Sequence, residues 1–336
     1  MEKLGAFAAF GTAVFWTASA IAFEGASKRV GVLAVNFWKV TMAFVLLALA
    51  ALATGGEFLP FGASARSWTF LTISGLIGFV IADYFLFNAY VLIGSRVTVV
   101  FQALTPLFAA AFGYVLLGES MRLGALVGMA TVVSGIVILV MARNAAVARA
   151  RGEGGGDRAR GAGQVSGPIE ARAAEGGAAE GGAIEARRRK DVQLRGYVFA
   201  FLSTVFQALG LVTSKLGLSG IEAIPATQIR VLAAMAGFAI QTLILRRTDE
   251  VFARPFREGR VALRIGLGSV VGPFLGVTLS LYALQHTDVG TASTLMALTP
   301  VLIIPPAIVF MRQKVSAMEI VGAIIAVGGT SLFFLV

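Results

Sequence analysis

Residues 103–120, ALTPLFAAAFGYVLLGES, join an apolar run of membrane-helix character to a motif that occurs twice in the chain. The tripeptide LTP at 104–106 returns at 298–300, an offset of 194 residues. The same offset aligns further small residues without gaps: Gly78 with Gly272, Ala89 with Ala283, Gly128 with Gly322 and Gly135 with Gly329. Self-similarity at a fixed spacing indicates an internal duplication.

The front of each half repeats with a slightly smaller offset of 191 residues. It aligns Phe15 with Phe206, Trp16 with Gln207, Glu24 with Lys215 and Lys39 with Arg230. The three-residue difference falls in the loop after the second helix of each half. The repeats are therefore assigned to residues 1–141 and 196–336.

Each half contains five apolar runs near the roughly 20 residues that cross about 30 Å of hydrocarbon. The ten runs are 4–23, 30–54, 67–91, 96–117, 123–141, 196–215, 224–245, 264–285, 289–311 and 317–336. Because five is odd, the second copy crosses the membrane in the opposite sense to the first. The sequence predicts an all-α integral membrane protein with ten transmembrane helices in two inverted five-helix repeats.

The composition excludes a purely soluble enzyme. Apolar residues make up 57% of the chain, charged residues 14%, and the mean hydropathy is +0.84. Without cysteine, and with His286 as the one histidine, the chain offers no thiol nucleophile, disulfide or Cys-ligated metal site. No phosphate-binding loop, HExxH or GxSxG motif occurs. We therefore expect no enzyme activity, no cofactor and no metal.

Residues 142–195 differ from the rest because they are rich in Gly, Ala, Arg and Glu and have almost no large apolar side chains. Such a segment cannot bury enough surface to fold alone, so we predict a disordered linker. A plain tether is favoured over a regulatory or partner-binding tail. Lys and Arg concentrate in this segment and in the loops on the same side, which places it in the cytoplasm and both termini outside. The net charge of +10 then reflects orientation and attraction to membrane lipids, with no nucleic-acid motif.

The repeated helices resemble the EamA-type permeases of the drug/metabolite transporter superfamily. The resemblance rests on FWTASAIAF at 15–23, on residues 103–120 and on the glycine-spaced helix that follows. The resemblance covers both halves and omits the linker. The second copy departs from the family pattern, because Arg312-Gln313 stands where the first copy has Gly118-Glu119. It implies a ten-helix basket in the inner or plasma membrane, whose central cavity binds a small solute, often for export. Substrates in that family include amino acids, other metabolites, nucleotide-linked sugars and drugs.

Three charged residues lie inside predicted spans, where each charge costs several kcal/mol and marks a functional hypothesis. They are Lys39, Asp83 and Arg230. Asp83 is interpreted either as a proton-titrating acid or as the structural partner of Lys39, which can lie at similar depth. Lys39 and Arg230 are equivalent in the repeat and are predicted to line a cavity that suits a carboxylate or phosphate.

Four amphipathic residues are weaker candidates for the cavity wall, with interhelical packing as the alternative: Trp16, Asn88, Gln207 and Tyr282. Pro106 and Pro300 each remove a backbone hydrogen bond and are predicted to kink their helices, as a static bend or as a hinge.

Together these features predict a permease that moves a small organic solute by alternating access, with proton coupling through Asp83 as a hypothesis. Two alternatives are left open. One is a flippase for a lipid or lipid-linked sugar on the same fold, and the other is a non-transporting scaffold or sensor whose linker docks a partner. Whether the chain forms a homodimer is also left open.

Overall fold

The computed structural model describes residues 2–94, 98, 101–102, 104–119, 123–160, 171–302 and 316–335. None of these described residues lies in a β-strand. The first half contains α1 (Glu2–Val30), α2 (Val32–Ala53), α3 (Ala65–Gly75), the π-helical segment η1 (Leu76–Ile81), α4 (Ala82–Ile93), α6 (Thr105–Leu117) and the start of α7 (Leu123–Arg160). The second half contains α8 (Ala171–Gly217), α9 (Ala223–Ile244), α10 (Thr248–Phe252), α11 (Arg254–Arg257), α12 (Gly259–Ser269), the π-helical segment η2 (Val270–Gly276), α13 (Val277–His286), α14 (Val289–Met296), α15 (Thr299–Leu302) and α17 (Ala317–Leu335).

Six helical stretches of the described chain are long and apolar enough to cross a membrane: Lys3–Val30, Val32–Ala53, Ala65–Ile93, Asp191–Gly217, Ala223–Ile244 and Gly259–His286. Three shorter apolar helices are Thr105–Leu117, Leu126–Leu139 and Ala317–Gly329. The predicted run 289–311 is divided between α14 and α15, and residues 303–311 lie outside the described residues. The count of ten spans therefore stays a prediction.

Large apolar side chains face outward from these helices, as lipid contact requires. Leu49 on α2 is 58% exposed, Leu243 on α9 is 67% exposed and Ile324 on α17 is 66% exposed. A surface of this kind is stable in hydrocarbon and unfavourable in water.

The duplication read from the sequence recurs in the helix boundaries. The offset that aligns Lys39 with Arg230 also carries both ends of α2 onto both ends of α9. The offset that aligns Gly78 with Gly272 does the same for α3 and α12, and it carries the start of η1 onto the start of η2. Each half therefore widens into a π-helix at the same place. Such widenings insert a residue into the helical ladder and are frequent at functional sites.

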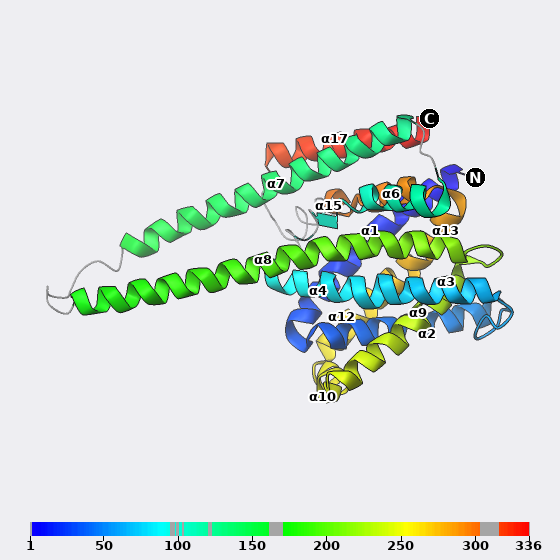
Figure 1. Ribbon diagram of the computed structural model, residues 1–336, viewed down its shortest axis with the longest axis horizontal. Helices are drawn as coiled ribbons and strands as arrows, with labels where there is room; N and C mark the ends of the chain where they lie inside the picture. Colours follow the sequence, from blue (N-terminus) through cyan, green and yellow to red (C-terminus); the bar gives the residue numbers. More distant parts are fainter. Residues whose placement is uncertain are drawn as a thin grey trace.

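The halves interlock instead of forming separate bodies. Helix α2 packs against α9, α3 and α4 pack against α8, and α1 packs against α12, η2 and α13. A Cβ atom on Gly210 of α8 would lie only 2.9 Å from the Cα atom of Gly78 in η1, so glycine permits this close crossing. Helices α7 and α17 form a further pair along one edge of the molecule (Figure 1).

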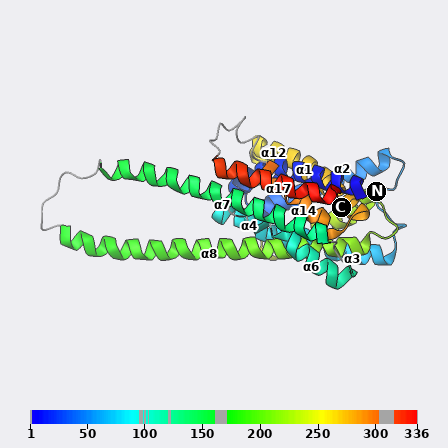
Figure 2. The ribbon, with the colours of Figure 1, turned by 90° about the horizontal axis from the view of Figure 1, so that it is seen from above.

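Helices α7 and α8 continue far beyond the helical body (Figure 2). They make residues 142–160 and 171–195 helical, and residues 161–170 lie outside the described residues. The structure thus differs from the disorder predicted for the linker. Ala, Arg and Glu, which are abundant there, are strong helix formers, and the parts of α7 and α8 inside the body provide helices that the segment can continue. The role of this segment as a tether stays a prediction.

Candidate functional site

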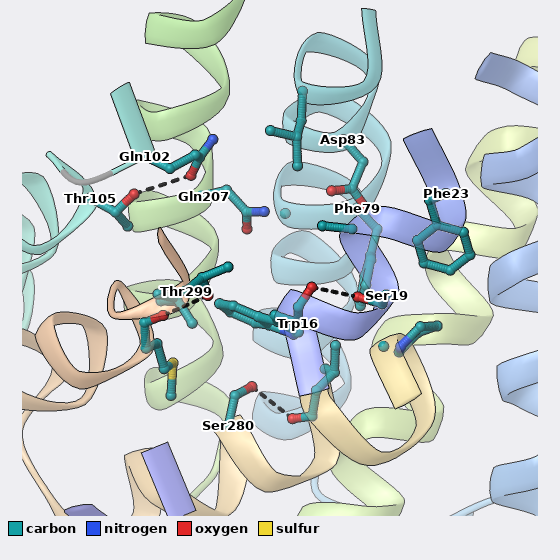
Figure 3. A pocket seen from close by; sticks show the side chains of 18 of the residues that line it. Trp16, Ser19, Phe23, Phe79, Asp83, Gln102, Thr105, Gln207, Ser280 and Thr299 are labelled. Atoms are coloured by element: carbon teal, nitrogen blue, oxygen red, sulfur yellow. Dashed lines mark hydrogen bonds between the residues drawn. The ribbon is translucent and has the colours of Figure 1, made fainter. Parts of the chain in front are cut away.

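A cavity of about 170 Å³ lies between the two halves at the level of the π-helical segments (Figure 3). Both repeats contribute to its wall. The first half supplies Trp16, Phe23, Lys39, Phe79, Asp83 and Gln102, and the second supplies Gln207, Arg230, Pro273, Val277, Ser280 and Thr299. Because the helices that carry these residues belong to different halves, a movement of one half against the other would reshape the cavity.

Lys39 of α2 and Asp83 of α4 form a buried ion pair in the cavity wall. The Lys39 Nζ atom donates a hydrogen bond of 2.6 Å to Asp83 Oδ2, and both residues are almost fully buried. The Phe87 ring centroid lies 4.2 Å from the same Nζ atom, and the Phe23 ring centroid lies 5.7 Å away. The carboxylate and the two aromatic faces together offset the free-energy cost of removing the Lys39 ammonium group from water.

Arg230 of α9 is the repeat equivalent of Lys39 and reaches the same cavity without a carboxylate partner. It is 5% exposed, and its guanidinium carbon lies 5.1 Å from the Phe79 ring centroid. Its Nε atom is buried without a hydrogen bond, and within the described part of the chain Arg230 has no ion pair. The offset that aligns the rear of each half places Val277 where the first half has Asp83.

Close approach of η1 to α9 positions the guanidinium. A Cβ atom on Gly78 would lie 3.2 Å from Arg230 Nη2, and one on Gly75 would clash with the Arg230 backbone. Because neither glycine has a side chain, these two positions provide the space that Arg230 occupies. A side chain at Gly78 would displace the guanidinium slightly, and one at Gly75 would require the backbone of α9 to move.

Amides and hydroxyls line the opposite side of the cavity (Figure 3). Gln102 Nε2 donates to Ser203 Oγ at 2.8 Å, and Thr105 Oγ1 donates to Gln102 Oε1 at 3.3 Å. The amide of Gln207 points into the cavity and has no hydrogen bond to a described residue. The Trp16 ring lies across the cavity, in contact with Gly276. The wall is thus mainly aromatic, with a few polar groups that are free to bind a solute.

No metal site is evident in this wall. Across the ranges that the structure describes, no group of three His, Asp or Glu residues lies close enough to hold a metal ion.

Comparison with known families identifies the fold and the general role. The profile of the EamA-like transporter family matches residues 3–141 and 194–335, one match for each repeat. The chain belongs to the EamA-like transporter family. It is accordingly a multi-pass membrane protein with the fold of the drug/metabolite transporter superfamily, and the resemblance stated from its motifs is confirmed. The family consists of transporters, not enzymes.

A solved structure, described as a crystal structure of a protein, is similar to this EamA-like chain over nearly its whole length. The two are 18% identical, with 98% of this chain and 96% of the other covered and a TM-score of 0.66. At this identity the likeness shows the fold alone. No curated protein matches the chain.

Five of the residues predicted from the sequence come together in the cavity of this EamA-like protein: Lys39, Asp83, Arg230, Trp16 and Gln207. Asn88 and Tyr282 do not. The Asn88 side chain donates to Tyr84 O on its own helix at 2.7 Å. Tyr282 stacks on His286 in a separate surface pocket, with 4.3 Å between ring centroids. A polar residue at membrane depth can satisfy itself locally, and the sequence does not show which face of its helix meets the cavity. A role of Asn88 and Tyr282 in solute binding stays a prediction.

The predicted proline kinks also need correction. Pro106 lies in the first turn of α6 and Pro300 is the second residue of α15, so each begins a helix instead of bending one. The first helical turn tolerates proline because its N–H groups have no partner within the helix. The chain turns at Leu104 and at Ala297–Leu298 immediately before these prolines.

The sequence did not single out Thr105 and Thr299 as cavity residues, although both lie in the wall. A signal was present, because these are the threonines of the two LTP motifs and are equivalent in the repeat. Gly78 and Gly272, another aligned pair, also line the cavity.

Proposed function

We propose that this protein is a permease that carries a small organic solute across the cell membrane by alternating access, with the central cavity as the solute site. The observation that carries the proposal is the position of the cavity between the two halves, with repeat-equivalent Lys39 and Arg230 both in its lining. Duplicated transporters place their solute at such an interface and expose it alternately by rocking one repeat against the other.

The arrangement in the membrane is part of the proposal. It comprises ten helices in two inverted repeats, both termini outside, and the segment 142–195 in the cytoplasm. The distribution of Lys and Arg supports this orientation. The resemblance to EamA-type permeases, which often export their solute, favours export.

An ion pair at one end of the bundle joins the halves and is a candidate gate contact. Glu119, just after α6, accepts from Lys215 Nζ at 2.6 Å and from the Val289 backbone N–H at 3.1 Å. Lys215 also donates to Thr287 O at 2.7 Å. These bonds connect α6 of the first half with the ends of α8 and α13 and the start of α14 in the second. Rocking of the halves would have to break or rearrange them.

The size of the cavity argues against the flippase alternative. About 170 Å³ is close to the roughly 150 Å³ of a protein cavity that holds benzene. A lipid-linked sugar is several times larger. A scaffold whose linker docks a partner has no need of buried charges in a central cavity. Deletion of residues 150–188 distinguishes the two functions, because a permease would still transport its solute without this segment.

The direct test compares metabolites inside and outside cells that produce the protein, an Asp83→Asn form, an exposed control variant Asp249→Asn, or none of these. We expect one class of solute to shift with the unchanged protein and the control. Equal profiles for all four cultures would overturn the permease assignment.

Proton coupling through Asp83 is tested by the pH dependence of the same flux. If a proton on Asp83 releases Lys39 during the cycle, Asp83→Asn removes the dependence on pH, while Asp83→Glu retains it. Recovery of each variant as a single folded species by gel filtration separates this effect from misfolding. An Asp83→Asn form with the original rate and pH profile would contradict the hypothesis.

A further inference from the structure

The two repeats supply the cavity with unequal charge. Each contributes one buried cation at the same position, Lys39 or Arg230, but only the first contributes an acid. Asp83 forms its ion pair with Lys39 at 2.6 Å, whereas its repeat equivalent, Val277, supplies no second carboxylate for Arg230, which shares the longer-range attraction of Asp83. The cavity wall therefore carries one uncompensated positive charge.

No other acid with a described side chain takes the place of the missing partner. Within the described residues Arg230 makes no ion pair, and its Nε atom is buried without an acceptor. The acids whose side chains the structure does not describe are Glu2 at the N-terminus and six residues of the segment between the repeats, Glu153, Asp157, Glu170, Glu175, Glu180 and Glu185. A buried, unpaired guanidinium is costly, and the cost is removed when an anion enters.

We propose that Arg230 binds the carboxylate of the transported solute, which makes this a permease for small monocarboxylates. The proposal rests on the proposed function, since it assigns the substrate class of the same cavity. A guanidinium presents a planar fork of N–H donors that matches a carboxylate with two parallel hydrogen bonds. The guanidinium packs against Phe79, and both residues line the cavity in which the solute would bind.

Charge and size favour a carboxylate over a phosphate monoester. A phosphate monoester carries about −1.5 to −2 charges at neutral pH, more than one free arginine balances, whereas a carboxylate carries one. The cavity of about 170 Å³ admits a solute built on about one six-membered ring. The Trp16 ring supplies an apolar surface for its body, and the free amide of Gln207 supplies a hydrogen bond.

Three probes of similar size and different charge test the charge preference: benzoate, benzyl alcohol and benzylamine. Binding to the purified full-length protein in detergent is measured by calorimetry at pH 8. We expect benzoate to bind roughly tenfold or more tightly than the neutral and cationic probes, as the loss of one charge-assisted hydrogen-bond pair implies. Equal affinities for benzoate and benzyl alcohol would overturn the proposal, and tighter binding of phenyl phosphate would overturn the choice of a carboxylate.

Two sets of variants locate the anion. Arg230→Met should lose the preference for benzoate, and Arg230→Lys should keep part of it. Val277→Asp should also abolish it by giving Arg230 the partner that Lys39 already has, whereas Val277→Asn, of similar size but uncharged, should not. The Val277 pair keeps the test decisive if Arg230→Met fails to fold. Benzoate binding that is unchanged in both Arg230→Met and Val277→Asp would contradict the assignment.

Flux of labelled benzoate into proteoliposomes, corrected for empty liposomes, separates this proposal from the permease assignment. Binding that depends on Arg230 without any flux would uphold the anion site and overturn transport of such solutes. Flux of benzoate and benzyl alcohol at equal rates would uphold transport and overturn the role of Arg230.

Discussion

At the scale of single residues, Lys39 and Arg230 show how equivalent positions can acquire opposite energetic roles. Lys39 is stabilised by Asp83, so its charge belongs to a closed pair. Arg230 is buried to the same degree and packs against the face of Phe79, with no ion-pair partner of its own beyond the longer-range attraction of the same Asp83. A transporter gains from this inequality, because a site that is fully satisfied by the protein has no reason to bind a solute.

This difference in pairing predicts that replacing each cation by methionine has opposite effects on the free energy of unfolding. Lys39→Met leaves Asp83 as an unpaired buried carboxylate and should lower the free energy of unfolding by about 3–5 kcal/mol. Arg230→Met removes a charge that lacks a partner and should leave stability unchanged or raise it. Thermal unfolding in detergent, in buffer without carboxylates, measures both. The double variant Lys39→Met/Asp83→Asn should recover most of the loss, and equal losses for the two single variants would contradict this account.

At the scale of elements, the contact between α7 and α17 depends on glycines in the two equivalent helices. A Cβ atom on Gly322 of α17 would lie 2.7 Å from Gly135 O and 2.8 Å from Leu139 Cα on α7. Gly328 also lies on α17, but a Cβ atom there would meet nothing within 4 Å. Alanine substitutions at Gly322 and Gly328 therefore distinguish the effect of close helix packing from the effect of helix propensity.

We predict that Gly322→Ala costs about 1–3 kcal/mol by forcing α7 and α17 apart. Gly328→Ala should be neutral or gain up to about 1 kcal/mol, because alanine favours helix over glycine. Denaturant unfolding of the two variants in the same detergent provides the comparison. If Gly322→Ala were as stable as Gly328→Ala, the close packing of these helices would be refuted.

The helices themselves could largely be predicted from the sequence, while their interruptions could not. The two offsets of the internal repeat predicted which elements correspond, and the boundaries of α2 and α9 follow the front offset to the residue. The turns before Pro106 and Pro300 were missed, because a proline can bend a helix or begin one and only the neighbouring backbone decides. The helical form of residues 142–160 and 171–195 was missed because composition alone cannot say whether a flanking helix will continue.

At the scale of the whole molecule, the candidate site emerges from comparing the two repeats more than from any single motif. The similar depth of Lys39 and Asp83 in two neighbouring antiparallel spans was enough to predict that these side chains can meet. The burial of Arg230 beside Phe79, and the absence of a partner for it among the described residues, required the packing of η1 against α9. Asn88 and Tyr282 lie outside this cavity for the same reason, since contacts across the molecule select the cavity-facing side of each helix.

The inversion of the repeats predicts that equivalent loops lie on opposite sides of the membrane. Gly62, in the loop after α2, and Gly259, the first residue of α12 after the corresponding connection, are both exposed, and a Cβ atom on either would meet nothing within 4 Å. The chain has no cysteine, so Gly62→Cys and Gly259→Cys each create one unique thiol. In intact cells, a membrane-impermeant maleimide should label Gly62→Cys and not Gly259→Cys, because the excess of Lys and Arg places the second loop inside. Permeabilised cells, in which both should react, provide the control. The reverse pattern would invert the orientation, whereas labelling of both from outside would refute the inverted repeat, because five spans separate the two loops in the ten-helix arrangement.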